Sequence, residues 1–172
     1  GVSFAGHGQN LDTGAKVIHA APNTTSTINS KSISKNGGNA TYRGLIKINA
    51  NAAGSKSVVS CESLMLDNDS KSDTIPVIDI QNDDVVMSHE AKIGKISDEA
   101  IISQMSIGIT EEEAKSMIVR GFVEPISKEL PLEYAVEMNN LIKLEFFQII
   151  SDSLYQCLLQ TFVQRFVAPC IY

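Results

Sequence analysis

The stretch SHEAKIGKISDE, Ser88 to Glu99, marks the point where an extended sequence pattern gives way to a helical one. His89 and Glu90 are adjacent in it, and adjacent side chains on a regular strand point to opposite faces. The two residues therefore line one pocket only if the backbone bends there. Otherwise, one of them has a purely structural role.

The residues before this stretch have the pattern of a β-structure. They are rich in Ser, Thr, Asn, Gly and β-branched residues, arranged in short alternating runs between turn residues. The predicted strands are residues 14–19, 26–34, 41–48, 57–66, 74–80 and 85–93. A sandwich or barrel and a stack of β-coils both fit this spacing. Small polar residues and Asn-rich corners favour the stack, because asparagines at corners can form ladders between successive turns.

The residues after Lys95 follow a helical period. Ser97 is a predicted N-cap, with Ile101, Ile102 and Met105 as the apolar stripe of the first helix, which ends at Gly108.

Thr110 and Glu113 form a predicted capping box for a second helix, which has Met117, Ile118 and Phe122 on its inner face and ends at Gly121. Pro131 opens a third helix, residues 132–144. The predicted fold class is an all-β body with an α-helical appendix rather than alternating βαβ units.

Composition excludes several classes of partner. The chain has 172 residues and a formal net charge of −6, without a cluster of basic residues, which argues against nucleic-acid or anionic-membrane partners. No run of apolar residues is long enough for a membrane span. The tail, Phe146 to Tyr172, is interrupted by polar residues and is predicted to be an amphipathic helix that docks on another surface.

The cysteines indicate the redox compartment, and the first residues indicate whether the chain is a fragment. Cys61, Cys157 and Cys170 are an odd, widely spaced set, which indicates neither a disulfide framework nor a zinc knuckle and fits a reducing compartment. The chain starts at Gly1 with a strand-like pattern, so we interpret it as a fragment or a processed chain.

Few residues carry a chemical signal by themselves. Cys61 lies in an apolar strand and is either a small core residue or a thiolate ligand. His89 is either locally hydrogen-bonded or functional, and Glu90, close to Lys92, is either half of an ion pair or functional. The segment around His7 and His19 is glycine-rich but lacks the Gly-Lys-Ser/Thr of a phosphate loop. Motifs for a nucleophile elbow or a His-Glu-x-x-His metal site are absent from the sequence, so no enzyme is predicted.

Six segments together resemble the SufB/SufD family, the scaffold proteins of the SUF iron–sulfur cluster assembly machinery. The segments are DTGAKVIH (12–19), YRGLIKI (42–48), CESLMLD (61–67), SHEAKIGKISDE (88–99), GITEEEAKSMIVRGF (108–122) and ELPLEYAVEMNNLIKLE (129–145). They follow the family order and cover Asp12 to Glu145. The Cys in CESL and the Glu in HEA are more similar to the SufB side of the family.

The resemblance implies a right-handed parallel β-helix followed by a small helical domain. Residues 1–95 would be the C-terminal part of the β-helix core, since family members normally carry more β-helix upstream. Residues 96–172 would be the helical domain, with an atypical tail from 146.

The resemblance also implies a site and partners. Cys61 would bind a nascent, transient iron–sulfur cluster as a thiolate, with His89 and Glu90 as nitrogen and oxygen ligand candidates and further ligands from a partner. Partners would be a SufC-type ABC ATPase, bound by the helices of residues 110–145, and SufD or a second SufB copy. The helices would also cap the open end of the β-helix. The protein would be a cytoplasmic scaffold, or an organellar one in a eukaryote, without turnover of its own.

A β-helical carbohydrate-active enzyme or adhesin is the alternative. It requires paired acids or exposed aromatic residues, and the chain is only 6% aromatic with no Trp. Asp83 and Asp84 are the acids to inspect, and they are more typical of a turn.

Overall fold

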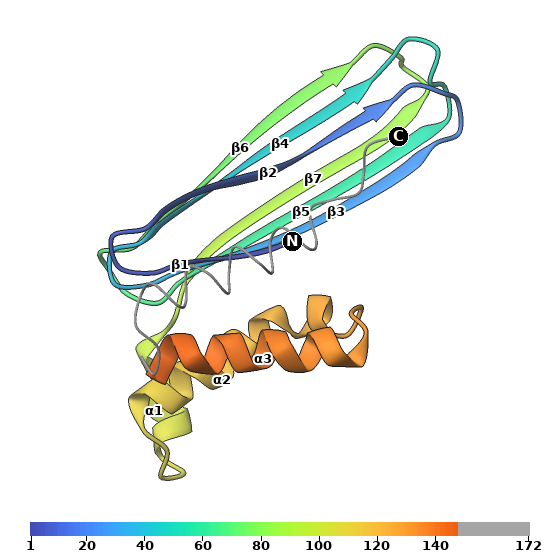
Figure 1. Ribbon diagram of the computed structural model, residues 1–172. Coiled ribbons are helices and arrows are strands. Elements are labelled where there is room, and N and C mark those ends of the chain that lie inside the picture. Colours follow the sequence, from blue (N-terminus) through green and yellow to red (C-terminus); the bar gives the residue numbers. More distant parts are fainter. Residues whose placement is uncertain (148–172) are drawn as a thin grey trace.

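The computed structural model describes residues 1–147 (Figure 1). The strands are β1 (Val2–Ala5), β2 (Asn10–His19), β3 (Thr25–Ser34), β4 (Asn39–Ile48), β5 (Ser55–Met65), β6 (Lys71–Ile80) and β7 (Val85–Lys95). The helices are α1 (Asp98–Met105), α2 (Glu111–Ser127) and α3 (Leu132–Phe147). Most of the tail, with Cys157 and Cys170, lies outside the described residues.

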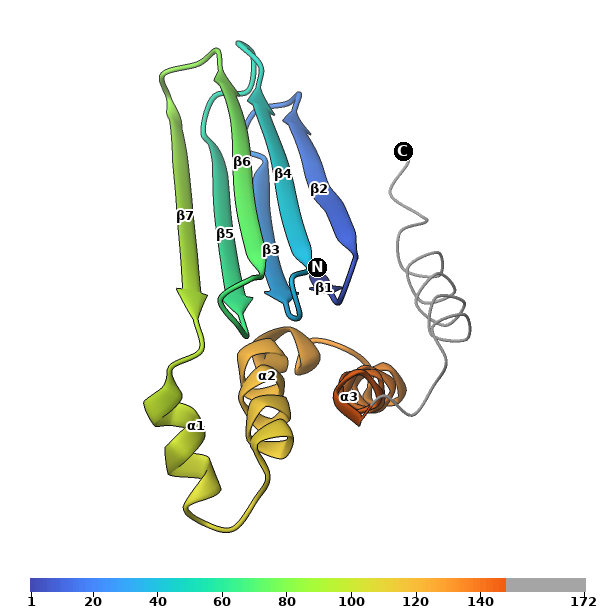
Figure 2. The ribbon, with the colours of Figure 1, turned by 90° about the vertical axis from the view of Figure 1, so that its left-hand side faces the viewer.

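The strands form two parallel sheets that face each other. Sheet A has the order β1-β3-β5-β7 and sheet B the order β2-β4-β6. Every strand therefore pairs with the equivalent strand one coil away and not with its neighbour in sequence (Figures 1 and 2). This arrangement is a β-helix, and it confirms the stack of coils over the sandwich or barrel.

The corners show why small polar residues occur so often in this sequence. The Asn51 side chain donates to the carbonyl of Ala20, 31 residues earlier, at 3.0 Å. The Asn82 side chain repeats this contact one coil later, with the carbonyl of Ala50 at 2.6 Å. These bonds satisfy backbone acceptors that a strand pairing leaves open at a turn. The asparagine side chains thus link successive corners through backbone carbonyls of alanines.

The interior of the β-helix is divided between apolar and hydroxyl-bearing side chains. Its apolar cluster consists of Tyr42, Ile46, Ile48, Ala52, Val59 and Cys61. At one end of sheet A, hydroxyls pair between coils instead: Ser26 donates to Ser57 at 2.9 Å. The buried His19 joins this ladder through its two ring nitrogens, 2.6 Å from the hydroxyl of Thr24 and 2.9 Å from that of Ser26. His19 is therefore a satisfied structural histidine.

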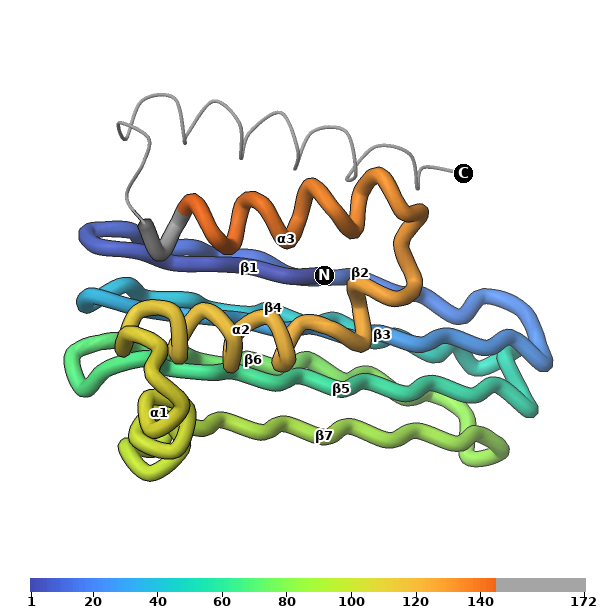
Figure 3. Tube along the Cα trace, turned by 90° about the horizontal axis from the view of Figure 1, so that it is seen from below, coloured from blue at the N-terminus to red at the C-terminus, as the bar shows by residue number. Residues whose placement is uncertain are grey.

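The helices cover the outer side of sheet A (Figures 1 and 3). Ile33 of β3 is fully buried in one apolar cluster with Val119 and Val123 of α2. Beside this cluster, the Lys31 ammonium lies 4.4 Å from the centre of the Phe122 ring and 2.5 Å from the Glu62 carboxylate. Apolar burial and a cation–π contact together fix α2 against the β-helix.

Both predicted helix caps are confirmed. The Ser97 hydroxyl accepts from the backbone of Ala100 at 3.1 Å, and Thr110 and Glu113 form the complete capping box. The backbone after the first helix also fits the predicted end at Gly108, which has a positive φ of 91°.

Three predictions about the helix faces and one about a helix end are wrong. Ile102, Met105 and Met117 are exposed, because α1 and α2 each bury only a narrow stripe. The second helix does not end at Gly121 but continues to Ser127. Val119 and Val123, both fully buried, lie on either side of this glycine. Their burial outweighs a helical glycine's penalty of about 1 kcal/mol.

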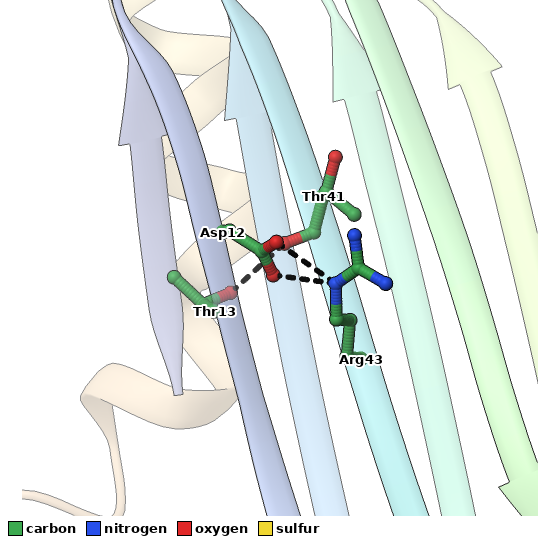
Figure 4. A network of polar contacts seen from close by, with 4 residues as sticks. All are labelled: Asp12, Thr13, Thr41 and Arg43. Carbon is green, nitrogen blue, oxygen red and sulfur yellow. Dashed lines mark hydrogen bonds and ion pairs between the residues drawn. The ribbon is translucent and has the colours of Figure 1, made fainter.

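Gly14 is required where β2 and β4 approach closely. A Cβ atom at Gly14 would lie 2.0 Å from the carbonyl oxygen of Arg43, its partner in the ladder. The Arg43 side chain is held beside this point, with its Nε 2.8 Å from a carboxylate oxygen of Asp12 (Figure 4). The clash is with backbone, so a side chain here forces the two strands apart.

We therefore expect Gly14→Ala to lower the free energy of unfolding by more than about 2 kcal/mol, measured by denaturant unfolding. Gly121→Ala is the matched control, because a Cβ at this helical position meets nothing within 4 Å. It should raise the free energy of unfolding by about 0.5–1 kcal/mol. Equal effects of the two substitutions would contradict the close approach at Gly14.

Candidate functional site

Cys61 lies on the inner face of β5. Alternate residues of this strand are buried, and Cys61 has only 3% of its surface exposed. Its ladder partners are Ser30 on β3 and Ala91 on β7. The thiol therefore points into the β-helix, one strand away from the edge of sheet A.

The surroundings of Cys61 are not purely apolar. Val59 precedes it on the inner face, but Ser63 follows it, and Ser30 and Ser32 line the same face on β3; all four are buried. Burial raises the pKa of the Cys61 thiol. Cys61 is thus a protonated thiol at neutral pH, and a metal that binds it must displace the proton.

His89 shares this inner face. It is paired with Val59 in the ladder between β5 and β7, so it is a diagonal neighbour of Cys61. Because β7 is the last strand of sheet A, His89 is only half-buried. It lines a cavity of about 10 Å³, roughly the space for one water molecule, together with Val59, Met87 and Gly44.

Glu90 lies on the opposite face of the same strand. It is exposed, and its carboxylate is 3.0 Å from the Lys92 ammonium. This hydrogen bond raises the pKa of Lys92. Since β7 pairs with β5 at every position from Val85 to Lys95, the backbone does not bend. The hypothesis that adjacent side chains escape alternation at the end of the stack is therefore wrong.

The fold thus brings two of the three predicted ligands together. Cys61 and His89 supply sulfur and nitrogen donors on one inner face, and both bind iron well. Glu90 cannot join them within one chain without a change of strand register. Among residues 1–147, no group of three or more His, Cys, Asp and Glu side chains is placed to hold a metal ion. Two donors from one chain are too few for a stable iron–sulfur cluster.

Sequence reasoning missed Tyr42, which belongs to the interior cluster that contains Cys61. It lies on sheet B, opposite sheet A, and is 5% exposed. Burial raises the pKa of its phenol, and the nearby Cys61 thiol adds to this effect. The alternation in TYRGLIKI was the available signal, because it places Tyr42 on the same face as Ile46 and Ile48.

Asp83 and Asp84 lie in the turn between β6 and β7, as the sequence indicated. The backbone N–H of Asp84 donates to the Asn82 side chain at 2.8 Å, and its carbonyl accepts from Gly54 at 2.7 Å. These contacts are typical of a structural turn.

Comparison with known proteins agrees with this architecture. Residues 1–122 match the family model described as SUF system FeS cluster assembly, SufBD core domain. The chain belongs to the SufBD family. Iron–sulfur cluster assembly SufBD family proteins of Staphylococcus haemolyticus, Staphylococcus epidermidis and Staphylococcus aureus (strain USA300) are each 58% identical to it over 144 residues.

The matched region covers 84% of this chain and 31% of each relative. The chain therefore spans about a third of the length of these SufBD relatives. Among its described residues, no helix is both long and apolar enough to cross a membrane.

Proposed function

We propose that this SufBD chain is part of a scaffold subunit of the SUF machinery, on which a nascent iron–sulfur cluster is held before it is passed on. The cluster is cargo, and the subunit has no catalytic turnover of its own. The observation that carries the proposal is the shared inner face of Cys61 and His89 at the last coil of the β-helix.

Incomplete ligation suits such a role. One thiolate and one imidazole from this chain bind iron firmly enough to start a cluster but too weakly to retain it permanently. Ligands from a partner would complete the site during assembly and leave it when the partners move apart. Glu90, on the outer face, is available to such a partner rather than to Cys61. A site of this kind, with Cys61 in it, is closer to SufB than to SufD.

The partner scaffold would be SufD or a second SufB-like copy, bound at the last coil. β7 and β6 are the end strands of their sheets, so each has an unpaired edge within the described chain. Their apolar residues are unusually exposed: Ile75 40%, Val77 49%, Ile78 44%, Ile80 43% and Val86 60%. Exposed apolar strand edges pair readily with another chain.

We expect Val86→Lys to weaken this pairing about tenfold or more, measured by sedimentation equilibrium of the full-length protein. A charge on the edge strand opposes burial against the partner. Val58→Lys is the control, because Val58 is 46% exposed on β5, one strand inside the edge. An unchanged association constant for Val86→Lys would exclude this edge as the interface.

The other partner would be a SufC-type ATPase, whose hydrolysis of ATP drives the conformational cycle. The helical region has exposed apolar side chains at Leu132 on α3 (77%), Ile107 in the turn after α1 (72%) and Ile102 on α1 (64%). We place the docking surface at Ile102 and Ile107, just before the range 110–145 that the resemblance implied. Exposed apolar residues mark an interaction site where they form a contiguous patch, and we propose that these two belong to such a patch. We also propose a cytoplasmic location, in keeping with the free thiol of Cys61.

Anaerobic reconstitution of the full-length protein with iron and sulfide tests the proposed function. We expect visible absorption from a cluster that is transferred to an apo-ferredoxin and is not retained. A protein that acquires no cluster, alone or with its partner scaffold, would refute the proposal.

A further inference from the structure

The hydroxyl of Tyr42 is buried without a partner. Its oxygen is inaccessible, and no described residue forms a hydrogen bond with it. A buried hydroxyl left unsatisfied costs about 1–3 kcal/mol, and nearly all such groups in folded proteins are bonded. An orphaned hydroxyl in a closed core therefore indicates that the group serves a partner which this chain does not supply.

Tyr42 and Cys61 are neighbours in the interior, and the Cys61 thiol adds to the rise of the pKa of the Tyr42 phenol. Both residues belong to one interior cluster, and they come from the two facing sheets. Gly44 makes room for the ring: a Cβ there would lie 3.1 Å from Cε1 of Tyr42 and 3.5 Å from its hydroxyl oxygen. A larger residue at position 44 would push the phenol out of this place.

The chemistry of sulfur explains why no bond is formed with the resting thiol. A neutral thiol is a weak acceptor, whereas a thiolate that has given up its proton to bind iron is a charged one. Ser30 and Ser63 lie on the same sheet as Cys61, with their short side chains beside it. In the interior cluster that contains Cys61, Tyr42 supplies a hydroxyl from the opposite sheet.

We propose that Tyr42 is a positioning residue for Cys61, whose hydroxyl donates a hydrogen bond to the Cys61 sulfur when that sulfur binds a metal ion. The inference rests on the proposed function only in naming iron as the natural metal. The hydrogen bond delocalises thiolate charge and holds the sulfur toward the inner cavity that His89 lines. The unsatisfied hydroxyl thus destabilises the metal-free protein, and it is already in place to donate when a metal binds.

Binding of Co²⁺ alone tests this inference, because a cobalt–thiolate bond gives a charge-transfer absorption band that requires Cys61. In the full-length protein, Tyr42→Phe keeps the ring and removes only the hydroxyl. We expect it to weaken Co²⁺ binding about tenfold, as measured by titration of this band. Its melting temperature should be unchanged or higher, because an unsatisfied buried hydroxyl is lost.

Two controls separate positioning from a general effect. Tyr134→Phe makes the same chemical change on α3, where the side chain is 42% exposed, and should leave Co²⁺ binding unchanged. Tyr42→Phe in a Cys61→Ala background should have no further effect on residual Co²⁺ binding, measured there by equilibrium dialysis because the band is lost, since the acceptor is gone.

The inference is overturned by equal Co²⁺ affinity in the unaltered protein and Tyr42→Phe, or by an effect of Tyr42→Phe that persists without Cys61. Absence of a Cys61-dependent band in the unaltered protein overturns it as well. If Tyr42 tunes Co²⁺ binding but iron and sulfide yield no cluster, the proposed function fails and the positioning role stands.

Discussion

Cys61→Ala is expected to reduce the yield of reconstituted iron–sulfur cluster to below about one tenth, the largest effect of any single substitution in the site. Cys61 is the only described cysteine, and the inner face offers no second thiol to replace it. His89→Ala should cause a partial loss, because a water molecule or buffer ligand can take the place of one nitrogen donor. The measurement is visible absorption after anaerobic reconstitution of the full-length protein.

Substitution of Glu90 distinguishes a ligand within the isolated subunit from a ligand across the subunit interface. Because its carboxylate lies on the outer face and pairs with Lys92, we expect Glu90→Gln to leave the cluster yield of the isolated subunit unchanged. A loss that is seen only when the partner scaffold is present would make Glu90 a ligand or contact across the interface. A loss in the isolated subunit would show that β7 changes register.

The control for Cys61→Ala is a substitution that removes another buried side-chain group from the same strand. Ser57→Ala removes a fully buried side-chain group from the inner face of β5, away from Cys61 along the strand. It should keep the full cluster yield. If Ser57→Ala and Cys61→Ala reduce the yield equally, the loss reflects damage to the β-helix and Cys61 is not a ligand.

Local sequence signals predicted the elements well and the faces less well. Strand alternation and the caps at Ser97 and Thr110 depend on residues within a few positions of each other, so they are readable from the chain. The choice of a stacked coil depended on pairing between strands about one coil apart, which no local pattern contains; the family resemblance supplied it. The course of α2 past Gly121 likewise depended on its packing against sheet A.

The candidate site likewise has one feature that local sequence predicts and one that depends on packing. Adjacency in sequence suggested that His89 and Glu90 act together, but the regular pairing of β7 with β5 separates them and places His89 with Cys61. This outcome follows from the period of a strand, so the sequence contained it once β7 was known to be unbroken. The role proposed for Tyr42 was not readable in this way, because it depends on which residues of sheet B face Cys61 across the interior.

Ile107→Glu, combined with Ile102→Glu, is expected to remove copurification of the ATPase with the full-length protein, a loss of affinity of at least about 100-fold. These side chains are 72% and 64% exposed, so charges there should not disturb the core. Removing the helices altogether is a poorer test, because α2 buries Ile33 and Lys31 of sheet A and its loss would expose them. Unfolding would then imitate a docking defect.

Leu132→Glu provides the matched control for the docking surface. Leu132 is 77% exposed at the start of α3, on a different helix from Ile102. The double substitution should abolish ATPase binding while Leu132→Glu retains it, with equal melting temperatures for both proteins. If instead Leu132→Glu releases the ATPase and the double substitution does not, the docking surface lies on α3. If both proteins retain the ATPase, the helices only cap the β-helix, and the contact that transmits ATP hydrolysis must be sought on the β-helix itself.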